Sequence, residues 1–266
     1  MILPRLLAAA GLLLLVACSA NPLGLRPGAT SVLQTFADPT PSEAVDMALD
    51  KHDADRRYRG TLILAKQRFA GDPLYLDLFA RGITDADPGV RAASARALGL
   101  HGRADHAPLL IARLTDEDPS VREEAARALQ RLHTPEAVEP LMNAMRRDRE
   151  DETPVRVQAA LALGQYAQAR VVEQLIAAMA DESLAVNASA LSSLRTLTGQ
   201  DFGYDRAEWQ RWYNATDTLF AARVAYLYPA FSRRKRWYEY IPLIPPPPNE
   251  PTGLPVGVNP DFTAGK

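Results

Sequence analysis

The sequence contains a single cysteine, Cys18, among 266 residues, so no disulfide can form within the chain. Aromatic residues are also scarce, at 7%, although hydrophobic residues as a whole make up 47%. Much of the apolar content is therefore small, and alanine in particular favours helix. The formal net charge of −2 gives no argument that the chain as a whole binds nucleic acid.

The common signatures of catalysis and metal binding are missing as well. No two of the four histidines are four residues apart, and the chain has no Cys-x-x-Cys pair, Gly-x-Ser-x-Gly turn or phosphate-binding loop. No His-Glu dipeptide occurs either. We therefore predict no metal site, no cofactor and no catalytic residue, and expect that the protein is not an enzyme.

The first residues are typical of an exported protein. Met1–Arg5 carries one positive charge, and the eleven residues Leu6–Val16 are apolar and uncharged. A membrane-spanning helix needs about 20 such residues. Residues 1–17 are therefore predicted to be a signal peptide.

The leader ends in Leu15-Val16-Ala17-Cys18, which resembles a bacterial lipobox. The resemblance implies cleavage before Cys18 and attachment of lipid to its sulfur, which anchors the protein in a membrane. The alternative is an ordinary signal peptide that happens to end at a cysteine. Ser19 follows, not the Asp that resembles an inner-membrane retention signal, so we expect the outer membrane, facing the periplasm. Residues 18–41, rich in Pro and Gly, are predicted to be a lipidated tether.

One stretch of sequence recurs along the middle of the chain. The residues around Val90 return, altered, around Val121, Val155 and Val186, at spacings of 31, 34 and 31. A fixed period of this length is the mark of a solenoid. First helices are predicted at about 73–81, 107–114, 135–146 and 170–180. Second helices are predicted at about 89–100, 120–132, 154–166 and 184–197.

Asp85, Pro88, Val90, Arg91 and Leu98, with their equivalents in later units, resemble HEAT-like repeats of the type found in phycobilisome lyases. The resemblance covers residues 42–198. It implies an all-α fold, a right-handed α-solenoid of about four to five helix pairs. Some hydroxylases of similar fold hold iron with His-Glu pairs. The absence of His-Glu dipeptides from this chain argues against that class of enzyme. The repeats serve many roles and say little about function.

Two segments follow the repeats. In residues 199–216, Trp209 and Trp212 share one helix face and are predicted to form an aromatic cap on the last repeat. The alternative is a ligand pocket of a lyase-like or other enzyme around them. Residues 217–266 are predicted to be a basic-aromatic and extended Pro-rich tail. It either binds a membrane surface or wall polymer or folds back along the solenoid. Its surface-binding residues would be Arg233, Arg234, Lys235, Arg236 and Trp237.

A column of arginines, Arg91, Arg122 and Arg156, occupies the same position in successive units. One interpretation is a stripe that binds anions. The other is a structural ladder, in which each guanidinium bonds turn carboxylates or carbonyls of a neighbouring unit. The matching Asp85 and Asp116 favour the ladder.

The second helices line the inner curve in proteins of this fold, which makes their outward positions candidates for partner binding. Val157 and Leu161 are apolar and one turn apart at two such positions, which indicates a docking patch. Glu123, Arg127 and Gln158 would form its polar rim. Scattered exposed apolar residues are the alternative. We predict a lipid-anchored scaffold or adaptor that binds another cell-envelope protein; the enzyme and the surface-binding tail remain alternatives.

Overall fold

The computed structural model describes residues 39–229, 240, 250 and 252–258. The chain divides into two compact units, Met1–Glu43 and Ala44–Lys266, each of which is described by itself. Cys18 and the basic-aromatic residues Arg233–Trp237 lie outside the described residues. Within the described part of the chain, no helix is long and apolar enough to cross a membrane.

Only residues 39–43 of the first unit are described, and helix α3 (Pro41–Ala48) begins there. The Thr40 N–H donates to Glu43 Oε2 at 2.8 Å, and the Glu43 N–H donates to Thr40 Oγ1 at 3.4 Å. This reciprocal pair is a capping box. Thr40 therefore caps the helix, rather than Ser42, which would suit the position by residue type alone.

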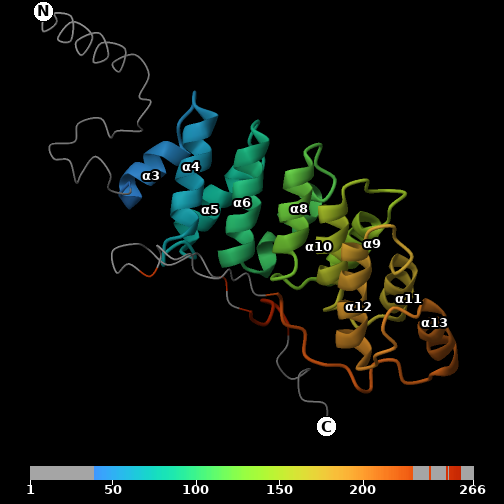
Figure 1. Ribbon diagram of the computed structural model, residues 1–266. Helices are drawn as coiled ribbons and strands as arrows, with labels where there is room; N and C mark the ends of the chain where they lie inside the picture. The colour runs from blue at the N-terminus through green and yellow to red at the C-terminus, as the bar shows by residue number, and fades with distance from the viewer. Residues whose placement is uncertain (1–38, 230–239, 241–249, 251, 259–266) are drawn as a thin grey trace, which may run out of the picture. The chain divides into compact units, whose positions relative to one another are not determined.

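The second unit is built from pairs of helices. Its second helices lie side by side in one row (Figure 1): α4 (Ala54–Ala65), α6 (Pro88–His101), α8 (Pro119–Ala128), α10 (Thr153–Leu163) and α12 (Leu184–Thr198). The other helices are α5 (Pro73–Gly82), η1 (Ala104–His106), α7 (Ala107–Arg113), η2 (Pro135–Ala137), α9 (Val138–Met145), α11 (Ala169–Ala178) and α13 (Arg206–Ala215). The all-α prediction is confirmed. Two isolated β-bridges pair Leu132 with Val256 and Tyr228 with Gly253.

Aspartates start three of the second helices. The side chains of Asp53, Asp87 and Asp118 each accept a hydrogen bond from a backbone N–H two or three residues later. A proline follows Asp87 and Asp118 at the first helical position, where its missing N–H costs nothing. The recurring Asp-Pro dipeptide therefore sets where α6 and α8 begin.

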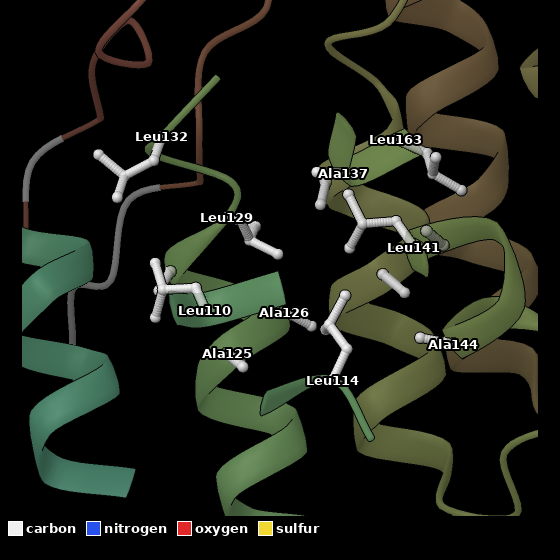
Figure 2. Close-up of a cluster of buried hydrophobic side chains, with 14 of the residues drawn as sticks. Leu110, Leu114, Ala125, Ala126, Leu129, Leu132, Ala137, Leu141, Ala144 and Leu163 are labelled. Atoms are coloured by element: carbon white, nitrogen blue, oxygen red, sulfur yellow. The ribbon is translucent and has the colours of Figure 1, made fainter. Parts of the chain in front are cut away.

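The core lies between the two layers of helices. Figure 2 shows side chains from α7, α8, α9 and α10 meeting there, among them Leu110, Leu129 and Leu141, all fully buried. Small residues let the second helices approach closely: an added Cβ at Gly99 would lie 2.7 Å from the Ala128 Cβ. Gly99 lies within α6, which runs on to His101, so the role of this glycine is close packing.

Candidate protein-binding face

The arginine column forms a ladder that joins successive units. Each guanidinium bonds a carboxylate in the turn of the next unit, at 2.6–3.3 Å. In Arg91, Arg122 and Arg156, the guanidinium Nη1 also donates to the backbone carbonyls five and six residues earlier, at 2.7–3.1 Å. The pairs are Arg57 with Asp85, Arg91 with Asp116, Arg122 with Glu150, and Arg156 with Asp181. The structural interpretation is confirmed, and these arginines are not available to a ligand.

The ladder also changes the acidity of its carboxylates. Burial by itself would raise the pKa of Asp116, but hydrogen bonds from Arg91 and from the Asp118 N–H outweigh it and hold the pKa below the usual value. Asp85 behaves in the same way: bonds from Arg57 and the Asp87 N–H overcome the effect of burial and lower its pKa. Both carboxylates are therefore charged at neutral pH.

Three details of the ladder come from the structure and not from the repeat pattern. Asp53 caps α4 as Asp87 caps α6, so Arg57 is the equivalent of Arg91. Asp116 and Asp181 accept hydrogen bonds from ladder arginines. Glu150 takes the acceptor position in the longer loop before α10.

The five predicted partner-binding residues lie on one surface of α8 and α10, and all are half-buried. Arg127 pairs with both Glu123 and Glu124 of its own helix. Gln158 accepts from Gln130 Nε2, at 2.7 Å to its side-chain oxygen. Leu161, Gln158 and Arg127 line one cavity of about 240 Å³. We call the exposed surface of α4, α6, α8, α10 and α12 the second-helix face.

The C-terminal segment of the chain lies on this same face. The Val224 N–H donates to the Thr196 carbonyl at 2.8 Å, at the end of α12. Past α8, the Val256 N–H donates to the Arg131 carbonyl at 2.7 Å, and the Val256 carbonyl accepts from the His133 N–H at 2.8 Å. Pro229 borders the cavity at Leu161. The described parts of the tail therefore run back past the C-terminal ends of the second helices (Figure 1).

One carboxylate of this segment bridges two helical units. Glu250 Oε2 accepts from Arg131 Nη2 at 2.5 Å, and Oε1 accepts from Arg96 Nη2. The Arg131 guanidinium lies over the Tyr228 ring, 4.7 Å from its centroid, a cation–π contact that fixes its orientation. The sequence indicated neither contact, because the partners are 119 and 154 residues apart.

A larger cavity of about 780 Å³ opens beside this bridge. Its apolar wall comes from α4 and α6 and includes Tyr58, Leu62 and Leu100, while Arg96 and Arg131 stand at its edge. This volume is typical of a ligand pocket. The second-helix face therefore combines an apolar hollow with two guanidiniums that already hold a carboxylate.

The aromatic residues after the repeats are mostly engaged with one another. Trp209 of α13 is 0% exposed, its Nε1–H donates to the Gly203 carbonyl at 2.9 Å, and its ring contacts Phe202 and Trp212. Helix α13 packs on α11, and Trp209 belongs to the buried core that the repeats share. That this cluster caps the last repeat remains a prediction. Trp209 presents neither its ring nor its N–H to a ligand. Within the described residues, no group of three His, Cys, Asp or Glu could hold a metal ion.

Comparisons with known proteins agree with this architecture. The HEAT repeats family matches residues 76–153, and the PBS lyase HEAT-like repeat family matches residues 155–181. These stretches of the chain are HEAT-like repeats. No curated protein matches the sequence.

Several solved structures are similar to the chain. An engineered protein is 19% identical, with 69% of this chain and 92% of that chain covered and a TM-score of 0.48. The complex of CpcE and CpcF of phycocyanin lyase from Nostoc sp. PCC7120 is 21% identical, with coverage of 64% and 80% and a TM-score of 0.40. YibA from Escherichia coli is 17% identical, with coverage of 71% and 78% and a TM-score of 0.47.

Proposed function

We propose that this HEAT-like repeat chain is a lipid-anchored scaffold that binds another protein of the cell envelope along its second-helix face. The observation that carries the proposal is that this face already holds an extended polypeptide, the chain's own residues around Val224, Tyr228 and Val256. A surface that binds backbone and a carboxylate in this way is suited to a protein partner.

Two further features support a binding role for this surface. The ladder commits its arginines to ion pairs with neighbouring units, so a partner would have to be recognised by other groups, among them those of the second-helix face. Val157 and Leu161 lie there one turn apart and are half-buried, so burial of the rest of each side chain by a partner could contribute roughly 1 kcal/mol each, about half of the value for a fully exposed side chain. The two side chains gain none of this free energy while their exposed parts remain in contact with water.

The membrane part of the proposal rests on the lipobox-like Leu15-Val16-Ala17-Cys18. Lipid on Cys18 would hold the repeats at a membrane, with residues 18–41 as the tether. We place the protein at the outer membrane, facing the periplasm, since Ser19 follows the cysteine. In this arrangement the scaffold meets envelope proteins and not nucleic acid.

The test is capture of the full-length lipoprotein from solubilised membranes, with its associated proteins identified by mass spectrometry. Val157→Asp with Leu161→Lys should deplete the specific partner at least about tenfold, the loss expected from about 1.4 kcal/mol. The matched control is Ala177→Asp with Ala180→Lys, which places the same charges on exposed positions of α11 and just beyond it. Equal capture by both double variants, with both folded by circular dichroism, contradicts the proposal.

Two alternatives make different predictions in the same experiment. If the tail binds lipid or wall polymer, neutralising Arg233, Arg234, Lys235 and Arg236 should abolish association while the double variant of α10 has no effect. A lyase-like or other enzyme near Trp212 should lose turnover on substitution there without losing captured proteins. The burial of Trp209 favours the scaffold over that enzyme.

A further inference from the structure

We infer that the second-helix face carries a binding site for an extended acidic peptide, which the chain's own Glu250 occupies until a partner displaces it. The site consists of Arg96, Arg131, the backbone of Arg131–His133 and the neighbouring cavity. The inference rests on the proposed function and names the chemistry of its partner: a segment with an acidic residue close to apolar ones.

Recognition of the carboxylate is already visible in the structure. Arg96 and Arg131 donate to different oxygens of Glu250, so one carboxylate satisfies two guanidiniums. Arg131 is oriented by the Tyr228 ring, and the side chains of Arg131 and Glu250 are only 14% and 16% exposed. Hydrogen bonds between charged groups in such partly dry surroundings are shorter and stronger than neutral ones. The site is therefore built for a carboxylate.

These two arginines stand apart from the structural ladder. Arg91 and Arg122 join the repeats, whereas Arg96 and Arg131 reach across to a segment more than a hundred residues away. Without Glu250, the nearest acidic group to Arg96 is Glu124, at 3.9 Å, and Arg127 shares it. Removal of the tail carboxylate leaves an excess of positive charge at the edge of the cavity.

Main-chain contacts show how a peptide would lie in the site. Val256 forms a parallel bridge with Leu132, and the Tyr228 N–H donates to the Gly253 carbonyl at 3.1 Å from the other side. Residues 252–256 are therefore held between the end of α8 and Tyr228. Backbone pairing of this kind accepts many sequences, as in proteins that bind a peptide by strand addition. The arginine pair would supply the preference for an acidic residue.

The cavity gives the site a place for apolar side chains. Its wall of Tyr58, Leu62 and Leu100 lies next to Arg96, and its volume of about 780 Å³ has room for several side chains. A segment that puts its carboxylate on the arginine pair would bring the neighbouring residues to this hollow. The site therefore favours an extended peptide that carries an acidic residue close to apolar ones.

Because Glu250 belongs to the same chain, it competes with any partner as a tethered ligand. Tethered groups reach effective concentrations of the order of millimolar. A free peptide must therefore bind the wild-type protein weakly, and loss of the Glu250 charge must strengthen that binding. Competition of this kind distinguishes an occupied recognition site from a contact that only stabilises the fold.

The experiment uses a fluorescent peptide with the sequence of residues 245–258, titrated into the full-length protein and followed by anisotropy. Glu250→Gln should bind it about tenfold more tightly than the wild type, since the tethered competitor loses the negative charge that Arg96 and Arg131 both bind. The same peptide with Gln in place of its Glu should bind Glu250→Gln about tenfold more weakly. Glu173→Gln, an exposed position on α11, is the matched control and should bind as the wild type does.

Two arginine variants complete the design. Arg131→Gln in the Glu250→Gln protein should abolish binding, and Arg96→Gln, at a side chain 38% exposed and so the safer change for folding, should weaken it. Melting followed by circular dichroism checks each fold. Equal affinity for the acidic and amide peptides, or for wild type and Glu250→Gln, overturns the inference. The two proposals can fail separately. If partner capture depends on Leu161 but the protein binds the acidic and amide peptides equally, the scaffold proposal holds and the acidic-peptide site is wrong.

Discussion

Arg122 and Glu150 are 28 residues apart in sequence, yet Arg122 Nε and Nη2 bond the two carboxylate oxygens of Glu150 at 2.6 and 2.8 Å. The Glu150 side chain is nearly inaccessible to water. It also accepts the N–H of Glu152 at 3.0 Å, so the turn before α10 is organised around it. A single ion pair thus joins α8 to the next unit and shapes that unit's turn.

Arg122→Ala should lower the free energy of unfolding by about 3–5 kcal/mol, because it leaves the Glu150 carboxylate buried and unpaired. Urea unfolding followed by circular dichroism measures the change. The control is Arg147→Ala, which removes an exposed pair with Glu182 and should cost about 0–1 kcal/mol. Similar losses for the two variants contradict the structural role of the ladder.

The loss of folding stability at acid pH should depend on Asp85 and Asp116, whose pKa values are lowered in the folded protein. A lowered pKa stabilises the fold at pH values above the unfolded pKa, about 3.9 for Asp, and this contribution is lost as the pH falls through the folded value. The melting temperature should therefore drop steeply below about pH 4.

Asp116→Asn tests this assignment directly. The variant should be less stable at pH 7, where it lacks the charge that faces Arg91, and should lose less stability than the wild type between about pH 5 and 2. Thermal melts over that range compare the two. Parallel pH profiles would show that Asp116 does not carry the effect.

Lipid attachment predicts a defined behaviour of Cys18. Cys18→Ser should leave a precursor that is uncleaved or soluble, and should take up no labelled fatty acid. Fractionation of cells with metabolic labelling measures both, and Ser19→Ala is the matched control, which should still be cleaved and acylated. A Cys18→Ser protein that partitions and is processed as the wild type would refute the lipoprotein hypothesis.

The repeats could be predicted because each unit carries its own local signal. The Asp-Pro start, the valine three residues after the capping aspartate and the following 3.6-residue apolar period all lie within about 15 residues. Glu150 could not be identified in this way, because it replaces the Asp of the other units within a longer loop. The first unit could not be aligned either, because Arg56 stands where the later units have valine.

The sequence left two possibilities open for the C-terminal segment: it binds a membrane surface or wall polymer, or it folds back along the solenoid. Periodicity shows which side of a second helix lacks a repeat partner, but it does not show what covers that side. The contact of Glu250 with Arg96 spans 154 residues and has no counterpart in another unit. The predicted patch at Val157 and Leu161 remains a prediction, with Pro229 now known to lie beside Leu161.

The close approach of α6 and α8 at Gly99 gives the last prediction. An added Cβ at Gly99 would lie 2.7 Å from the Ala128 Cβ and 2.8 Å from its Cα, so α6 and α8 must move apart to admit a methyl group. Gly→Ala within a helix normally gains stability. At Gly99 the clash should reverse the sign, and Gly99→Ala should destabilise the protein by about 1–3 kcal/mol, as overpacking of a core does. Gly71→Ala is the control, since its nearest neighbour is the His101 carbonyl at 3.9 Å. Chemical unfolding in which both variants match the wild type would mean that α6 and α8 are not packed this closely.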